Sequence, residues 1–244
     1  MGPKLVIIFD VLTFLINLAL ITTIKIPQPQ TATKSVLLVW QGLKEGLHFV
    51  RSSSALRFLI TIMFLRGATM IGVFPLLPAF VQGDLQGNAF QVGLFAAAAS
   101  MGFVLSSFFA VKLEKIVSPF HILIWGSALA GLLLLPFLLI RSFWLLLPFR
   151  LLSAFAYGAG NLVANVHLAR LAPSGIRGRV SSLSWAFIKT AQVASSVTFG
   201  ALATQLGTPV VITTAGLMLT FGCLLLAKFT QESAYKALKV ETVS

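Results

Sequence analysis

The sequence has few charged residues, since Asp, Glu, Lys and Arg make up only 10% of its 244 residues. An ordinary soluble domain has about a quarter. Acidic residues are the scarcest of them, at 6, whereas Lys and Arg together number 18. Hydrophobic residues reach 57%, above the roughly 45–50% that is typical of soluble domains. This composition excludes a soluble globular protein and predicts one that lies in the lipid bilayer.

Cysteine is almost absent, because Cys223 is the only one. An internal disulfide and a cysteine pair for metal or redox chemistry are therefore excluded. The three histidines, His48, His121 and His167, lie in or beside three different loops and form no ligand set. The motifs H-E-x-x-H, G-x-S-x-G and G-x-x-x-x-G-K are also missing. We expect neither an enzyme nor a protein that holds a metal or another cofactor.

The formal net charge of +12 could indicate a nucleic-acid partner. However, no basic stretch alternates with aromatic residues, as a binding surface for single strands would. Membrane proteins also collect Lys and Arg on their cytoplasmic loops. We therefore expect the lipid bilayer, and no nucleic acid, as a partner.

Seven hydrophobic stretches approach or exceed the length of about 20 residues that a transmembrane helix needs. They are 5–24, 58–80, 90–111, 120–140, 143–162, 180–203 and 208–229. The sequence thus predicts an all-α integral membrane protein with about seven transmembrane helices. We expect 1–24 to hold the first helix, 25–57 a cytoplasmic loop, 58–229 a bundle of six helices and 230–244 a cytoplasmic tail.

The loop 25–57 contains an amphipathic pattern. Hydrophobic residues recur at helical spacing at Val36, Val39, Trp40, Leu43 and Leu47. Polar and charged residues occupy the other side, at Lys34, Gln41, Lys44, Glu45 and Arg51. This pattern predicts a helix that lies on the membrane surface, and a helix packed on protein fits it equally well.

The distribution of cations predicts the orientation. Thirteen Lys and Arg fall on one side of the predicted spans, namely Lys25, Lys34, Lys44, Arg51, Arg57, Lys112, Lys115, Arg170, Arg177, Arg179, Lys228, Lys236 and Lys239. Two, Lys4 and Arg141, fall on the other. Because cytoplasmic loops carry the excess of Lys and Arg, we expect a multi-pass protein of the cell membrane with a cytoplasmic C-terminus.

Three cations lie inside the predicted spans: Arg66, Arg150 and Lys189. A Lys or Arg near the bilayer centre costs at least a few kcal/mol unless it faces a bundle interior or a water-filled cavity. Arg66 and Lys189 are each nine or ten residues beyond a loop cation, which places them about 13–15 Å deep. We expect both to face a shared cavity. Arg150 is shallower, and its side chain could instead extend to the outer surface.

Polar residues accompany these cations on the same helical faces. Arg150, Tyr157, Asn161 and Asn165 form one stripe along the fifth span. Gln192 follows Lys189 by three residues on the sixth span. Together these residues are candidates for a substrate or ion pathway. The alternative is that the amides only form hydrogen bonds between helices, which are worth about 1 kcal/mol each.

Small residues and helix breakers have their own positions. Ala98, Gly102, Ser106 and Ala110 repeat every four residues, which predicts a face where another helix packs closely. Pro75 and Pro78 predict a bend or a looser helix in the second span. The same prediction applies to Gly158 and Gly160 in the fifth.

Four segments resemble the C-terminal half of a major facilitator superfamily transporter, in the branch of bacterial drug and siderophore exporters. They are FDVLTFLI at 9–16, GLKEGLHFVR at 42–51, PLLPAF at 75–80 and LAPSGIRGRV at 171–180. The resemblance implies that the seven spans correspond to helices six to twelve, and that the six-helix bundle at 58–229 is a half-bundle. Arg66, Arg150 and Lys189 would then border the central cavity. The segment 112–116 departs from the family's loop motif, so we expect no gating role for it.

The resemblance also implies a function, which is export of a small-molecule substrate by proton antiport. Because these transporters bind substrate between two six-helix halves, we expect a C-terminal half or a fragment. Such a chain would pair with an N-terminal half-transporter or with itself. Two alternatives are a membrane subunit that scaffolds a partner without transporting anything, and a heptahelical receptor. The receptor motifs D-R-Y and N-P-x-x-Y are absent.

Overall fold

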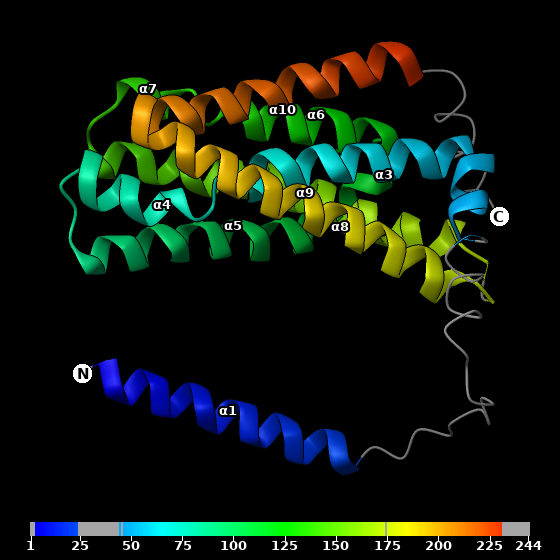
Figure 1. Cartoon of the computed structure of the whole chain (residues 1–244), viewed down its shortest axis with the longest axis horizontal. Helices are drawn as coiled ribbons and strands as arrows, with labels where there is room; N and C mark the ends of the chain where they lie inside the picture. The colour runs from blue at the N-terminus through cyan, green and yellow to red at the C-terminus, as the bar shows by residue number, and fades with distance from the viewer. Residues whose placement is uncertain (1–2, 24–43, 45, 174, 231–244) are drawn as a thin grey trace. The chain divides into compact units, whose positions relative to one another are not determined.

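The computed structural model describes residues 3–23, 44, 46–173 and 175–230, and every regular element in these ranges is a helix (Figure 1). The chain divides into two units, Met1–Gln41 and Gly42–Ser244. The first contains α1 (Pro3–Thr23). Most of the predicted amphipathic helix and nearly all of the predicted tail lie outside the described residues, although 46–52 are helical.

The second unit is a helical bundle. Its elements are α3 (Ser54–Arg66), η1 (Gly67–Ile71), α4 (Leu76–Ala79), η2 (Phe80–Asp84), α5 (Ala89–Glu114), α6 (Pro119–Leu132), α7 (Pro136–Leu139), α8 (Phe143–Leu171), α9 (Arg177–Leu206) and α10 (Thr208–Thr230). Five helical stretches are long and apolar enough to cross a membrane: Ser54–Asp84, Ala89–Glu114, Pro119–Leu139, Phe143–Leu171 and Thr208–Phe229. The predicted all-α membrane bundle is confirmed.

Two predicted spans do not meet both criteria within the described residues. α9 has 30 residues, about 45 Å of helix, but Ser, Thr, Gln and Lys side chains make it less apolar than the other five. In the first unit, α1 has 21 residues, of which the part Ile7–Thr23 is an apolar helix shorter than these five. The number of seven spans therefore stays a prediction.

The second predicted span is broken in the middle. α3 begins at Ser54, where the Ser53 hydroxyl accepts a hydrogen bond from Leu56 N at 3.3 Å. The helix thus begins about one turn before the predicted membrane span at 58, and the boundary of the span stays a prediction. The π-helical segment η1 is followed by a turn at 72–75, and α4 then leads into a second π-helical segment, η2. Pro75 lies at the end of this turn and cannot donate a backbone hydrogen bond. The predicted bend is confirmed there.

The fifth predicted span is longer than expected and unbroken. α8 continues to Leu171, nine residues beyond the predicted end at 162, because the polar residues Asn161 and Asn165 do not interrupt the helix. Because α8 is continuous through Gly158 and Gly160, the prediction that they loosen it is wrong, and a bend there stays a prediction. These glycines provide room for neighbouring side chains. A Cβ on Gly158 would lie close to the hydroxyl of Ser106 on α5.

The stripe of small residues on α5 is a packing face, as predicted. Ala98, Gly102, Ser106 and Ala110 are all buried, and α5 packs along α8. A Cβ on Gly102 would collide with the backbone carbonyl of Leu151. In lipid the hydrophobic effect does not drive helices together, and the van der Waals contacts that such a close approach allows stabilise their association instead.

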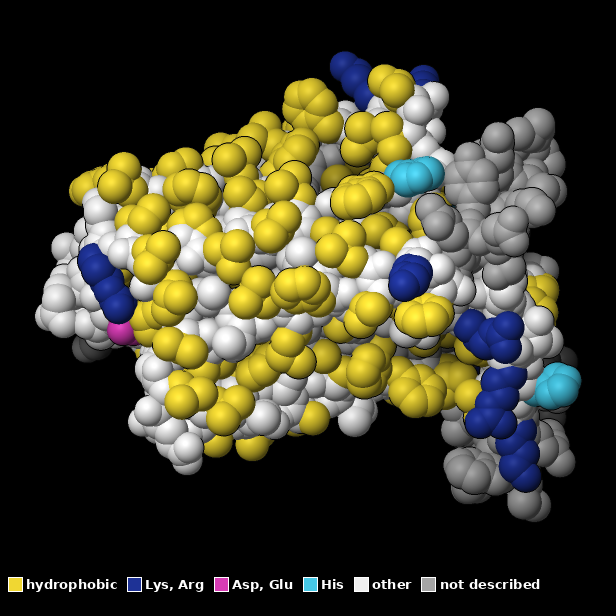
Figure 2. Space-filling model, turned by 90° about the horizontal axis from the view of Figure 1, so that it is seen from above, with side chains coloured by type: hydrophobic (Ala, Val, Ile, Leu, Met, Phe, Trp, Pro, Cys, Tyr) yellow, Lys and Arg dark blue, Asp and Glu magenta, His cyan; other side chains and the backbone are white. Residues whose placement is uncertain are grey.

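The flanks of the bundle carry exposed hydrophobic side chains, which Figure 2 shows in yellow over most of the visible face. Phe108, Trp125, Trp144 and Phe221 are among them. Most Lys and Arg visible in this view gather at one end of the unit. A hydrophobic flank between polar ends is the surface that a bilayer solvates.

Candidate functional site

Arg66, the last residue of α3, is only 1% exposed and is held by two other helices. Its Nη1 donates a hydrogen bond to the hydroxyl of Ser127 on α6, and its Nη2 donates to the carbonyl of Tyr157 on α8 at 2.6 Å. The guanidinium also lies 4.0 Å from the centroid of the Tyr157 ring. Among the described residues, no carboxylate forms an ion pair with it.

The absence of a side chain at Gly160 creates the space for this guanidinium. A Cβ on Gly160 would lie 2.5 Å from Nη1 of Arg66. α8 therefore contributes the ring and the carbonyl of Tyr157 as partners of the guanidinium. About one turn later, it also leaves space for the guanidinium at Gly160. The cation is bound chiefly by protein dipoles and an aromatic face, which partly replace the water it has lost.

A cavity of about 230 Å³ lies beside this guanidinium, and four of the predicted pathway residues line it. We call it the Arg66 cavity. Its predicted members are Arg66, Tyr157, Asn161 and Lys189, and they are joined by Met63, Ile71, Phe74, Phe103, Trp185 and Ile188. The structure thus brings Arg66 and Lys189 to one cavity.

Lys189 differs from Arg66 because its side chain is exposed. Its Nζ donates a hydrogen bond to Oε1 of Gln192 at 3.1 Å and lies 6.0 Å from the centroid of the Trp185 ring. These contacts stay on α9 itself. Gln192 does not line the Arg66 cavity, and neither does Asn165, whose amide donates a hydrogen bond to the carbonyl of Asn161 at 2.8 Å.

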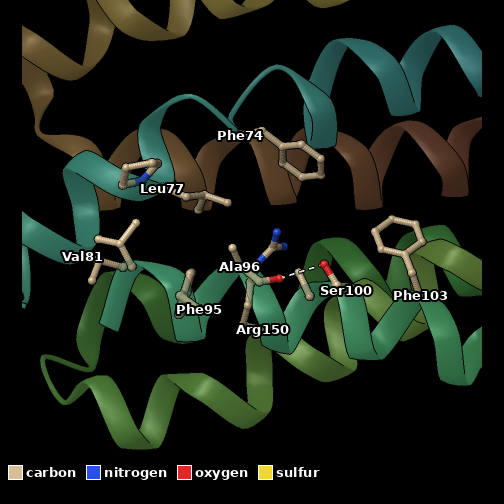
Figure 3. A pocket seen from close by; sticks show the side chains of 11 residues that line it. Phe74, Leu77, Val81, Phe95, Ala96, Ser100, Phe103 and Arg150 are labelled. Atoms are coloured by element: carbon tan, nitrogen blue, oxygen red, sulfur yellow. Dashed lines mark hydrogen bonds between the residues drawn. The ribbon is translucent and has the colours of Figure 1, made fainter. Parts of the chain in front are cut away.

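Arg150 on α8 is 5% exposed and lines a second cavity of about 290 Å³. We call this the Arg150 cavity. It is formed by Phe74, Leu77, Pro78, Val81, Val92, Phe95, Ala96, Ala99, Ser100, Phe103 and Arg150. Figure 3 shows the guanidinium pointing into the space between α5 and the segment with Phe74 and Leu77.

The guanidinium of Arg150 has aromatic neighbours but an unfilled donor. It lies 5.4 Å from the centroid of Phe74 and 5.7 Å from that of Phe95. Its buried Nε has no hydrogen-bond partner among the described residues. The alternative from the sequence, in which the Arg150 side chain extends to the outer surface, is therefore wrong, because this side chain is buried. The two cavities share Phe74 and Phe103, so this aromatic pair forms part of the wall of both.

The model of the transmembrane secretion effector family, within the major facilitator superfamily, matches residues 1–241. The chain belongs to this family. Curated proteins, in contrast, include no match to it. Membership makes the chain a multi-pass membrane protein of the major facilitator type. Such proteins are in general transporters and not enzymes, and they carry small substrates across the bilayer.

For this major facilitator protein, sequence reasoning missed several residues that surround the two arginines. Ser127 is the only hydroxyl in the apolar helix α6, and such an isolated polar residue could have indicated a buried partner. Gly160 and the aromatic pair of Phe74 and Phe103 gave no such signal. Their roles depend on how four helices pack together, which periodicity within one helix does not specify.

Proposed function

We propose that the chain performs secondary active export of small molecules, as one bundle of a two-bundle transporter, with the two cavities as its part of the pathway. The observation that carries this proposal is that Arg66, Arg150 and Lys189 all line adjoining cavities inside one membrane bundle. A cation at such depth is costly and is retained mainly where it serves a pathway. Energy from a proton gradient is what the family resemblance implies.

The remaining candidates extend this pathway along two helices. Tyr157 and Asn161 line the Arg66 cavity from α8. Asn165 lies one turn beyond Asn161, and Gln192 holds the ammonium group of Lys189 from α9. In our proposal these polar groups offer hydrogen bonds to a substrate as it leaves the two cavities.

The second bundle is either another copy of this chain or an N-terminal half-transporter. Alternating access requires two bundles that rock about a site between them. Lys189 and Trp185 are exposed on α9 beside the Arg66 cavity, so a facing bundle would cover the ammonium group. Transport of drugs or siderophore-like compounds in the outward direction is the part of the proposal that rests on resemblance alone.

The cations at one end of the second unit support a cytoplasmic C-terminus in the plasma membrane. Lys112, Arg170, Arg177 and Lys228 are exposed near helix ends that share this side. In a Cys223→Ser background, a cysteine at Gly175 should therefore escape an impermeant thiol reagent added from outside, whereas one at Gln86 should react. The opposite labelling would reverse the orientation.

Transport is tested with the purified full chain in lipid vesicles, alone and together with a six-span N-terminal half. We expect efflux of dyes and siderophore-like compounds that depends on an imposed proton gradient, and that is lost in Arg150→Gln. The control Arg170→Gln removes the same charge from an exposed position of the same helix and should keep the activity. Robust transport by a strictly monomeric chain would overturn the two-bundle proposal. No gradient-dependent transport in any combination would overturn export.

A further inference from the structure

The charges around the two cavities are all positive. The described residues of the second unit include two carboxylates, and both lie elsewhere. Asp84 pairs with Arg141 at 3.7 Å, and Glu114 lies 3.5 Å from Nε2 of His167. Neither lines the Arg66 cavity or the Arg150 cavity. The electrostatic potential at these cavities therefore favours an anion and opposes a cation.

Arg150 is the cation that is free to meet such an anion. The Arg66 guanidinium already donates to Ser127 and to the carbonyl of Tyr157. Arg150 is 5% exposed, yet its Nε donates to no described residue. Burying a charged donor away from water costs free energy when no acceptor replaces the water. A ligand with oxygen acceptors would offset this cost.

The rest of the Arg150 cavity is apolar. Besides Ser100, whose hydroxyl bonds to the carbonyl of Ala96 in its own helix, the wall is formed by aromatic and aliphatic residues (Figure 3). Phe74 and Phe95 lie on two sides of the guanidinium. A volume of about 290 Å³ is near the lower end of the range for small-molecule sites. One or two fused rings suit both the walls and the volume.

We propose that the Arg150 cavity binds an amphipathic organic anion, with its carboxylate or sulfonate on the Arg150 guanidinium and its ring between Phe74 and Phe95. A guanidinium offers parallel donors that match the two oxygens of a carboxylate. The proposal rests on the proposed function only in identifying this anion as the class of molecule that is transported. Binding itself requires no transport.

The test uses two ligands with the same ring and opposite charge, 2-naphthoate and 2-naphthylmethylammonium. Binding to the purified full chain in a nonionic detergent is measured by equilibrium dialysis, with empty micelles as the blank. A second readout is the temperature of unfolding, which is monitored through labelling of the thiol of Cys223 that is buried in the folded state. A ligand that binds the folded state raises this temperature. We expect binding and stabilisation by the naphthoate only.

Three variants locate the site. Arg150→Gln should weaken naphthoate binding about tenfold or more, since a hydrogen bond to a charged group is lost. Arg150→Lys keeps the positive charge but loses the paired, parallel donors of the guanidinium, so it should bind naphthoate with an intermediate affinity. Arg170→Gln should bind as the unchanged chain does. Cys223 protection in the absence of ligand shows that each variant is folded.

The outcomes separate this inference from the proposed function. Equal binding of the ammonium compound, no naphthoate binding, or full binding by a folded Arg150→Gln variant would overturn the anion site. A chain that binds naphthoate but transports nothing would refute export alone. A chain that exports cations and binds no naphthoate would refute the anion site alone.

Discussion

Arg66 and Arg150 lie in the same bundle at similar burial, but their guanidinium groups have different surroundings. Around Arg66, α6 and α8 supply a hydroxyl, a carbonyl and an aromatic face. Around Arg150, two phenyl rings and a cavity leave Nε without a partner among the described residues. Depth in the membrane therefore does not by itself separate the roles of these two arginines. The number of its donors that the protein fills distinguishes a group that joins helices from one that awaits a ligand.

This comparison predicts that conservative substitutions of the two arginines differ most strongly. Arg66→Lys should lower the free energy of unfolding by about 2–3 kcal/mol, because one ammonium group cannot reproduce the fork and its stacking on Tyr157. Arg150→Lys should cost less than about 1 kcal/mol, since no hydrogen bond from the protein is lost. Unfolding is measured by thermal labelling of Cys223, with loss of helical circular dichroism as a second probe. Equal losses would show that the two surroundings are energetically alike.

The opening at Gly160 gives a second way to disturb the Arg66 region alone. Gly160→Ala places a methyl group against Nη1 of Arg66, and overpacking of this kind costs about 1–3 kcal/mol. The better helix propensity of Ala offsets up to about 1 kcal/mol of this. We expect a net loss of about 1–2 kcal/mol in the same unfolding measurement.

Gly93→Ala is the matched control for this substitution. Gly93 lies inside α5, and a Cβ there would meet nothing within 4 Å. This variant should gain up to about 1 kcal/mol from helix propensity. If Gly160→Ala were as stable as Gly93→Ala, the guanidinium of Arg66 would not be fixed in its place.

The sequence could predict features that depend on one helix at a time. Hydrophobic length identified five of the seven predicted spans, and small residues four positions apart identified the face of α5 that packs on α8. The presence of cations within spans was equally visible. Each of these features depends on the spacing of residues along one helix, because this spacing determines which face of the helix a residue occupies and how deep in the membrane it lies.

The partners of those cations could not be predicted in this way. The hydroxyl that binds Arg66 is 61 residues away in sequence, and the carbonyl is 91 residues away. Which of several helices faces Arg66 depends on the rotation of each helix about its axis and on the close approach at Gly160. Depth alone favoured Arg66 and Lys189 for a cavity and left open whether Arg150 faces a cavity or the outer surface. In the structure Arg150 is buried, and the Arg66 guanidinium donates its hydrogen bonds to protein groups.

The smallest expected effect comes from the hydroxyl of Ser127, which is one of several groups around Arg66. Ser127→Ala removes the acceptor of Nη1 and leaves the carbonyl and the ring of Tyr157 in place. We expect a loss of about 1 kcal/mol, in the range of hydrogen bonds between membrane helices. Ser107→Ala is the control, because Ser107 also bonds to a carbonyl of its own helix but is exposed and meets no cation. A Ser127→Ala variant as stable as Ser107→Ala would mean that dipoles from α8 alone hold the guanidinium, and that α6 contributes packing only.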